Sequence, residues 1–242
     1  MGDDEDNNAF WSSRWSDDPS WHLDEVNPHL RRHLSHLAPP PGRHRIFVPL
    51  CGKSLDLKWL HSKGHSVVGV ELVEEVVKNF FEENEPNYLV KDLGWGTLYT
   101  NARRSLQIYV GDIFKLKMEE LGRFDGVWDR GALVSIPEAR RAEDRGALVS
   151  IPEARRAEYA AIIRRLLRPH FRYLLNNFLY RPPEKFEGPP YTVPNYTVHE
   201  LFGQIAIWKI LETEEMMSKE EMQARGLEVA MQVFLLLTPK HL

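Results

Sequence analysis

The chain has 242 residues, of which 43% are hydrophobic and 27% charged, a balance typical of a globular protein that buries one sizeable core. Its formal net charge is -4 and no dense cluster of Lys and Arg occurs, so nucleic acid is not an expected partner. The single cysteine, Cys51, excludes an internal disulfide and indicates a reducing compartment.

The acidic N-terminal residues resemble neither a signal peptide nor an Arg-rich transit peptide. No segment approaches the roughly 18 consecutive apolar residues that a membrane span needs. We therefore expect a cytoplasmic protein without a membrane partner, and we expect residues 1–9 to be a disordered acidic tail. Residues 10–242 are expected to form a single domain.

The first predicted helix begins at Asn27-Pro28, because proline is favoured at the first helical position, and the proline-rich run before Gly42 ends it. Beyond it, apolar runs with β-propensity alternate with segments of helical periodicity. The predicted strands are 45–50, 66–71, 106–112, 124–128, 172–179, 207–212 and 229–237, and the predicted helices are 55–64, 74–85 and 160–167. This alternation predicts a doubly wound, mostly parallel α/β sheet with helices on both faces. No long helix separates the last two strands, which indicates that one of them is antiparallel.

An identical tandem duplication interrupts this pattern. Residues 129–143 read DRGALVSIPEARRAE, and residues 144–158 repeat those letters without a change. No structural repeat family has this period, so we interpret the repeat as a recent in-frame duplication or an error in the gene model. The strand 124–128 is joined to the first copy and the helix at 160–167 to the second. One copy's worth of chain must then bulge out between them, at a closure cost on the order of 1–2 kcal/mol.

The turn after the first strand lies where open α/β sheets bind nucleotides, at the carboxyl ends of the strands. Of the dinucleotide fingerprint G-x-G-x-x-G, this turn keeps only Gly52, which disfavours a nicotinamide enzyme. Glu71 ends the second strand nineteen residues after Gly52 and is placed to accept from ribose hydroxyls. Asp112 and Ile113 end the third strand, where an adenine would lie. The alternatives are a solvated carboxylate at Glu71 and a turn cap at Asp112.

Three tryptophans, Trp11, Trp15 and Trp21, occur within eleven residues ahead of the sheet. Aromatic faces hold organic cations such as a sulfonium, and indole rings can exclude water from a site. The alternative is that these rings only dock the front helix. Cys51, at the turn of a buried strand, is interpreted as a packed thiol rather than a nucleophile. The histidines form no metal constellation, and no metal is expected.

Four segments together resemble the thiopurine S-methyltransferase family. They are VPLCGK at 48–53, GHSVVGVE at 64–71, WDRGALV at 128–134 and GPPY at 188–191. The resemblance runs from about Trp11 to the C-terminus and is interrupted only by the duplication. The order of the first and third motifs is specific to this family and is not a general signal of its fold.

The resemblance implies a seven-stranded, Rossmann-like fold that binds S-adenosylmethionine (SAM), with residues 10–42 as an N-terminal lid and helix of one methyltransferase domain. It implies that Leu50 contacts SAM through its backbone, that Glu71 holds the ribose, and that Asp112 and Ile113 lie at the adenine. Trp11 and Trp15 would cover SAM, Trp21 would lie beside the acceptor, and Arg130 would lie near both. Arg130 is assigned in the first copy, because that copy continues its strand; Asp144 and Arg145 of the second copy are given no role.

The implied reaction transfers a methyl group from SAM to the sulfur of an aromatic or heterocyclic, thiopurine-like thiol by in-line displacement. Such a thiol presents a thiolate near neutral pH, so no catalytic acid or base is named. A monomer with a small-molecule thiol substrate is expected. Two alternatives remain open: a methyltransferase for selenium, tellurium or other small soft nucleophiles, and a SAM-binding protein that the duplication has inactivated.

Overall fold

The computed structural model describes residues 2–16, 19, 21–135, 154–186 and 188–240. Within these ranges, side chains are described from residue 8 onward, except at residue 154. The chain divides into two compact units, residues 1–126 and residues 127–242. Among the described helices, none combines the length and the apolar character that crossing a bilayer requires.

The first unit is built on a mixed sheet with the strand order β3-β4-β5-β2-β1. β1 pairs with β2 and β2 with β5 in parallel, whereas β3–β4 and β4–β5 are antiparallel. The bounds of these strands are β1 (Arg45–Val48), β2 (Ser66–Glu71), β3 (Tyr88–Asp92), β4 (Thr97–Asn101) and β5 (Leu106–Val110). The parallel core expected from the alternating pattern is therefore confirmed in β1, β2 and β5.

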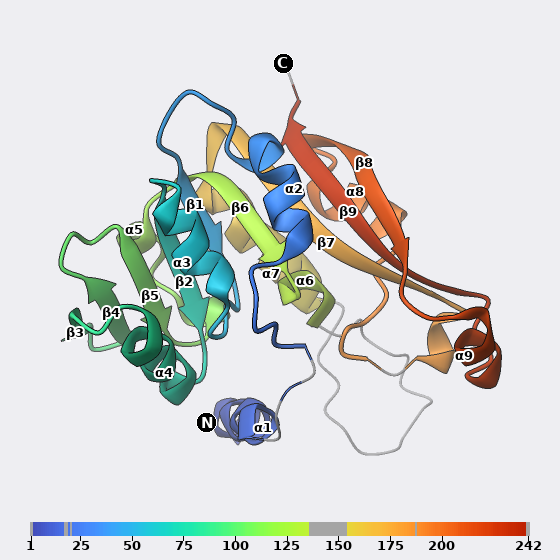
Figure 1. Cartoon of the computed structure of the whole chain (residues 1–242), viewed down its shortest axis with the longest axis horizontal. Coiled ribbons are helices and arrows are strands. Elements are labelled where there is room, and N and C mark those ends of the chain that lie inside the picture. Colours follow the sequence, from blue (N-terminus) through green and yellow to red (C-terminus); the bar gives the residue numbers. More distant parts are fainter. Residues whose placement is uncertain (1, 17–18, 20, 136–153, 187, 241–242) are drawn as a thin grey trace. The chain divides into compact units, whose positions relative to one another are not determined.

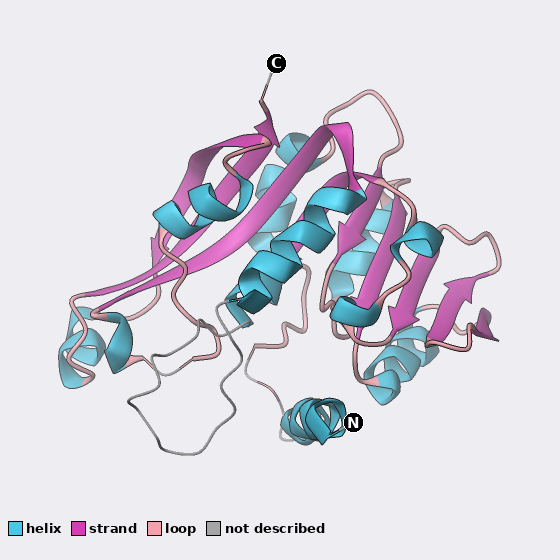
Figure 2. Cartoon of the chain, turned by 180° about the vertical axis from the view of Figure 1, so that it is seen from behind, coloured by secondary structure: helices cyan, strands magenta, loops and turns pink. Residues whose placement is uncertain are grey.

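Helices of the first unit cover both faces of its sheet. Figure 1 shows α3 and α4 on the face turned toward the viewer, and the short α5 lies on the opposite face (Figure 2). The bounds are α1 (Gly2–Ser16), α2 (Pro28–Leu37), α3 (Leu55–Ser62), α4 (Glu74–Asn84), the 3-10 turn η1 (Ile113–Lys115) and α5 (Met118–Leu121). α2 begins as expected, with the Asn27 side chain accepting from the backbone N–H groups of His29 and Leu30.

Helix α1 includes most of the segment that was expected to be an acidic tail. Residues 2–9, expected to belong to a disordered acidic tail, are helical in the structure.

The second unit contains the strand order β6-β7-β9-β8, and β7 and β8 both pair with β9 in antiparallel fashion. Figure 2 shows α7 and α8 on the face of these strands that is turned toward the viewer. The bounds are β6 (Phe124–Arg130, which begins in the first unit), α6 (Ala132–Ser135), α7 (Ala154–Leu166), β7 (Leu167–Arg181), η2 (Pro183–Lys185), α8 (Asn195–Phe202), β8 (Ala206–Glu215), α9 (Lys219–Ala224) and β9 (Val229–Pro239). The expected antiparallel pairing among the last strands is confirmed.

The described residues hold nine strands, whereas seven were expected. The hairpin of β3 and β4 was not predicted, because side chains of β3 are largely exposed and give no alternating apolar pattern. β4 pairs with β5, so the hairpin extends the edge of the sheet beyond the expected strands. The pairings described above include both antiparallel and parallel ones, so the sheet is mixed.

The structure draws on both copies of the duplication. Asp129–Arg130 of the first copy complete β6 and Ala132–Ser135 form α6, whereas residues 154–158 of the second copy begin α7. The expectation that the strand continues into the first copy and the helix follows from the second is confirmed. Asp144 and Arg145 lie outside the described residues.

Candidate active site

The turn after β1 has an unusual backbone. Leu50 has a φ of 44° and Gly52 a φ of 52°, both in the left-handed region that side chains rarely adopt. The Cys51 N–H donates to the Val70 carbonyl at 2.9 Å, which holds the turn against the carboxyl end of β2. A non-glycine residue in this region stores strain on the order of 1–3 kcal/mol, and such strain clusters at functional sites.

Glu71 ends β2 directly beside this turn, with 6% of its surface exposed. Its Oε1 accepts from the backbone N–H groups of Leu72 (2.8 Å) and Val73 (3.0 Å), and its Oε2 accepts from Gly52 (2.9 Å). Burial raises the pKa of the Glu71 carboxyl, and the three N–H donors only partly offset that rise. A carboxylate has about four acceptor positions, so one position on Oε2 is left for a further donor. The alternative of a solvated carboxylate is wrong.

An aromatic cluster from the N-terminal segment lies on the turn. A Cβ built on Gly52 would fall 2.6 Å from Cζ2 of Trp15, so the indole ring packs directly on the glycine backbone. Trp21 meets Trp15 at 6.0 Å and Trp11 at 6.4 Å between ring centroids, in both cases edge to face. His22 stands 5.8 Å from Trp15. The structure thus brings the three tryptophans together at the Gly52 turn, where only a residue without a side chain fits.

Arg14 belongs to the same cluster and was missed by the sequence analysis. Its guanidinium carbon lies 5.1 Å from the Trp21 ring centroid and 5.5 Å from that of Phe10. Its Nε is buried and has no hydrogen-bond partner among the described residues. A signal existed in the sequence, because Arg14 stands one residue before Trp15, but nothing in the spacing distinguished it from a solvated arginine.

Asp112 and Ile113 follow the third parallel strand, β5. The Gly111 N–H donates to the Glu71 carbonyl at 2.8 Å, which brings the end of β5 beside the end of β2. The Asp112 side chain accepts from the Phe114 N–H at 3.0 Å and caps η1, as the turn-cap alternative predicted. Ile113 is buried. One Asp112 oxygen is thus engaged locally, and the structure does not test the adenine role of either residue.

Arg130 is the last residue of β6 and belongs to the second unit. It precedes Gly131, whose φ is 97°. Asp129, just before it, is fully buried and accepts hydrogen bonds from Tyr159 and Tyr173. The strand position expected for Arg130 is confirmed, and its role near SAM stays a prediction.

Cys51 is buried, and burial raises the pKa of its thiol well above the usual value, with the negative charge of Glu71 adding to the effect. A thiol held in its neutral form is a poor nucleophile, so the interpretation of Cys51 as a packed residue is confirmed. No group of three or more His, Cys, Asp or Glu side chains suited to a metal ion occurs among the residues that the structure describes.

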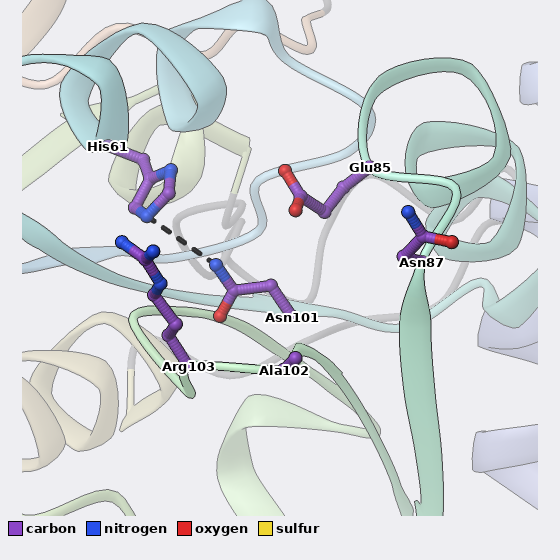
Figure 3. A pocket seen from close by; sticks show the side chains of 6 residues that line it. All are labelled: His61, Glu85, Asn87, Asn101, Ala102 and Arg103. Carbon is purple, nitrogen blue, oxygen red and sulfur yellow. Dashed lines mark hydrogen bonds between the residues drawn. The ribbon is translucent and has the colours of Figure 1, made fainter.

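A cavity of about 250 Å³ lies at the other end of the first unit's sheet. Figure 3 shows His61 and Arg103 on one side of it and Glu85 and Asn87 on the other, with a hydrogen bond between His61 and Asn101. Its residues lie at the end of α3, just after α4, and at the end of β4 and in the turn from β4 to β5, near the amino ends of the parallel strands. None of the predicted site residues lines it.

Comparison with solved structures defines the class of this fold. The 1,6-didemethyltoxoflavin-N1-methyltransferase of Burkholderia thailandensis, solved with S-adenosylhomocysteine, is 15% identical, with a TM-score of 0.53 over 97% of this chain and 85% of that chain. A likeness at this identity concerns the fold alone. The fold is that of the SAM-dependent methyltransferases, in which parallel strands present their carboxyl ends to the cofactor.

The sequence comparisons identify the family. The Thiopurine S-methyltransferase family model matches residues 6–143 and 144–240. The Thiopurine S-methyltransferase of Mus musculus is 33% identical over 234 residues, 95% of this chain and 90% of the relative. That of Pseudomonas fluorescens is 36% identical over 211 residues, 87% of this chain and 88% of the relative. This chain belongs to the thiopurine S-methyltransferase family.

The two matched ranges meet between Glu143 and Asp144, which is the junction of the two copies. A family match that breaks at this junction is what an insertion of one extra copy produces. The break agrees with the structure, which takes its strand from the first copy and its helix from the second.

Proposed function

We propose that this chain transfers the methyl group of SAM to the sulfur of an aromatic or heterocyclic, thiopurine-like thiol. The observation that carries the proposal is the constellation of Glu71, Gly52 and Trp15 at the carboxyl ends of β1 and β2. Family membership supports the reaction class. The comparisons do not favour the alternative of a selenium or tellurium methyltransferase.

The residues at the turn fit SAM. The remaining acceptor position on Glu71 Oε2 suits one ribose hydroxyl, and a turn with Gly52 as its single glycine suits a cofactor without a pyrophosphate. Indole faces such as those of Trp11 and Trp15 stabilise a cation. In this proposal Asp112 and Ile113 lie at the adenine. When bound, SAM supplies an electrophilic methyl group on a positively charged sulfur.

The chain's own contribution is positioning and the exclusion of water. Trp11, Trp15 and Trp21 form a cover over the turn, which keeps water from the transferring carbon. Trp21 lies beside the acceptor, and Arg130 orients the charged end of SAM and the acceptor. An in-line displacement by a thiolate needs no proton transfer in its rate-limiting step, so holding the two reactants in line supplies most of the acceleration.

The test uses the full chain with labelled SAM and either a thiopurine or thiophenol. We expect label in the methylated thiol, and we expect Glu71→Ala to weaken SAM binding by about tenfold or more in calorimetry, the scale of a lost hydrogen bond to a charged group. Glu75→Ala, which removes an exposed carboxylate four residues along, is the matched control. Arg130→Ala should reduce transfer.

Three results would count against parts of the proposal. SAM binding without product would support the inactivated SAM-binding protein instead. Equal SAM affinity in Glu71→Ala and in the unaltered chain would remove Glu71 from the ribose site. Transfer unaffected by Arg130→Ala would remove Arg130 from the site.

We further propose that the chain acts as a monomer in the cytoplasm, with no nucleic acid partner. The absence of a dense basic cluster and the single, buried cysteine support this view. Light scattering at micromolar concentration should give the mass of one chain, and a larger mass would contradict it.

A further inference from the structure

The end of β6 contains a buried carboxylate with four hydrogen-bond donors. Asp129 Oδ1 accepts from the backbone N–H groups of Ala132 (3.0 Å) and Leu133 (3.2 Å). Its Oδ2 accepts from the hydroxyls of Tyr159 (2.7 Å) and Tyr173 (2.6 Å). Asp129, Tyr159 and Tyr173 are each fully buried, and all belong to the second unit. These three side chains are called the Asp129 cluster below.

Burial and hydrogen bonding act in opposite directions on the Asp129 carboxyl. All four of its partners are able to donate to it. Burial raises the pKa of Asp129, and each of the four hydrogen bonds works in the opposite direction. Burial, together with the negative charge of Asp129, raises the pKa of both tyrosines well above the usual value, so their hydroxyl protons stay in place. Hydrogen bonds to a buried charge are among the stronger ones in proteins.

The cluster fixes the backbone on both sides of Arg130. Asp129 precedes Arg130 in β6, and the two amides that it binds follow immediately, at the start of α6. Between them Gly131 takes a φ of 97°, a conformation that a residue with a side chain would resist. Arg130 and Gly131 are the two residues between these fixed points, so Arg130 is the residue whose side chain they position.

The same cluster joins the two ends of the duplication. Asp129 is the first residue of the first copy, and Tyr159 is the first residue after the second copy. Their hydrogen bond therefore ties together the two chain ends between which all the repeated residues lie. Tyr173 comes from β7 and anchors the carboxylate to a strand outside the repeat.

We propose that Asp129, Tyr159 and Tyr173 form a positioning cluster that sets the backbone of Arg130 and closes the duplicated segment. The part that concerns Arg130 rests on the proposed function, whereas the closure of the segment does not. Asp129 is a positioning residue: it acts on the reactants only through Arg130.

The first test needs no activity. Hydrogen exchange of the Ala132 and Leu133 amides reports directly on the two bonds to Oδ1. We expect these amides to exchange at least about tenfold faster in Tyr159→Phe and Tyr173→Phe, because each change leaves the carboxylate with fewer donors. Tyr180→Phe is the matched control: it removes another buried hydroxyl of β7, whose partner is the Met216 sulfur. Unchanged exchange in both variants would overturn the closure role.

The duplication supplies a second control. Asp129→Asn and Asp144→Asn make the same change at the first residue of two identical copies. We expect only Asp129→Asn to speed exchange of the two amides. Should Asp129→Asn fail to fold, the two tyrosine variants still decide the matter. Equal effects of both substitutions would overturn the assignment of the cluster to the first copy.

The second test separates positioning from general structure. We expect Tyr173→Phe to weaken SAM binding by several-fold in calorimetry. We expect the double variant Tyr173→Phe, Arg130→Ala to bind SAM no more weakly than Arg130→Ala alone, because both changes would act through Arg130. Additive losses would show that the cluster acts apart from Arg130 and would overturn this part. If the unaltered chain binds no SAM, the proposed function fails. The hydrogen-exchange experiment still tests the closure role, because it needs no SAM.

Discussion

At the scale of single residues, Gly52 is the position where the site leaves least room. Its φ of 52° and the Trp15 ring both oppose a side chain there. We expect Gly52→Ala to lower the free energy of unfolding by roughly 1–2 kcal/mol and to displace the indole ring. Chemical denaturation gives the first quantity, and tryptophan fluorescence reports the second.

Gly64→Ala is the control for the Gly52 substitution. Gly64 has a φ of 89° but nothing within 4 Å of a built Cβ, so its substitution carries the backbone strain alone. Gly52→Ala should therefore be the more destabilising of the two and the only one to change fluorescence. Equal behaviour of both variants would show that the Trp15 contact adds nothing.

Glu71 should also make stability depend on pH. Its folded pKa is raised by burial above the unfolded value of about 4.3, so the stability that its protonation contributes is fully present below about pH 4.3 and is lost as pH rises through the folded pKa. We expect the unfolding free energy of the unaltered chain, minus that of Glu71→Gln, to fall over this window. Urea denaturation at several pH values measures it, with Glu75→Gln as an exposed control. A difference that grows with pH would mean that the three N–H donors outweigh burial.

At the scale of elements, periodicity predicted those that bury a face. β2 and α4 were placed within about a residue of their bounds, because both carry the apolar pattern of a buried strand or an amphipathic helix. The hairpin of β3 and β4 was missed because Leu89 and Val90 of β3 are more than half exposed. α1 was missed because its N-terminal sequence carries charge and no apolar stripe.

The residues of the site also divide into those that could be predicted from the sequence and those that could not. Gly52 and Glu71 could be predicted because each follows a strand directly, so strand order alone brings them together. The Asp129 cluster could not, since its members are 30 and 44 residues apart and nothing local marks a tyrosine that will meet a carboxylate. Likewise, spacing placed Trp15 near the sheet, but not on Gly52.

At the scale of the whole molecule, the duplication yields a prediction about stability. Deleting residues 144–158 gives the same chain as deleting residues 129–143, and it leaves only an Ile-Pro-Glu segment between Ser135 and the start of α7. We expect the shortened chain to fold with an unfolding free energy higher by roughly 1–2 kcal/mol, because a shorter connection loses less entropy on closure.

Guanidinium denaturation of the two chains measures this difference, and calorimetry with SAM checks that the site is retained. Equal SAM affinity in the two chains is expected, since the deletion leaves the first unit unchanged and keeps one copy of the segment that contains Arg130. A shortened chain that is less stable would show that the extra residues contribute packing of their own.

The two copies form different elements of the structure, and this determines which substitutions each copy can accept. In the first copy, Asp129–Ser135 hold the end of β6 and α6, whereas in the second copy residues 154–158 open α7. A saturation library across residues 129–158 should therefore give two complementary profiles, intolerant at the front of one repeat and at the back of the other. The two copies would then diverge in different places: the first copy would accept substitutions toward its carboxyl end, and the second copy toward its amino end.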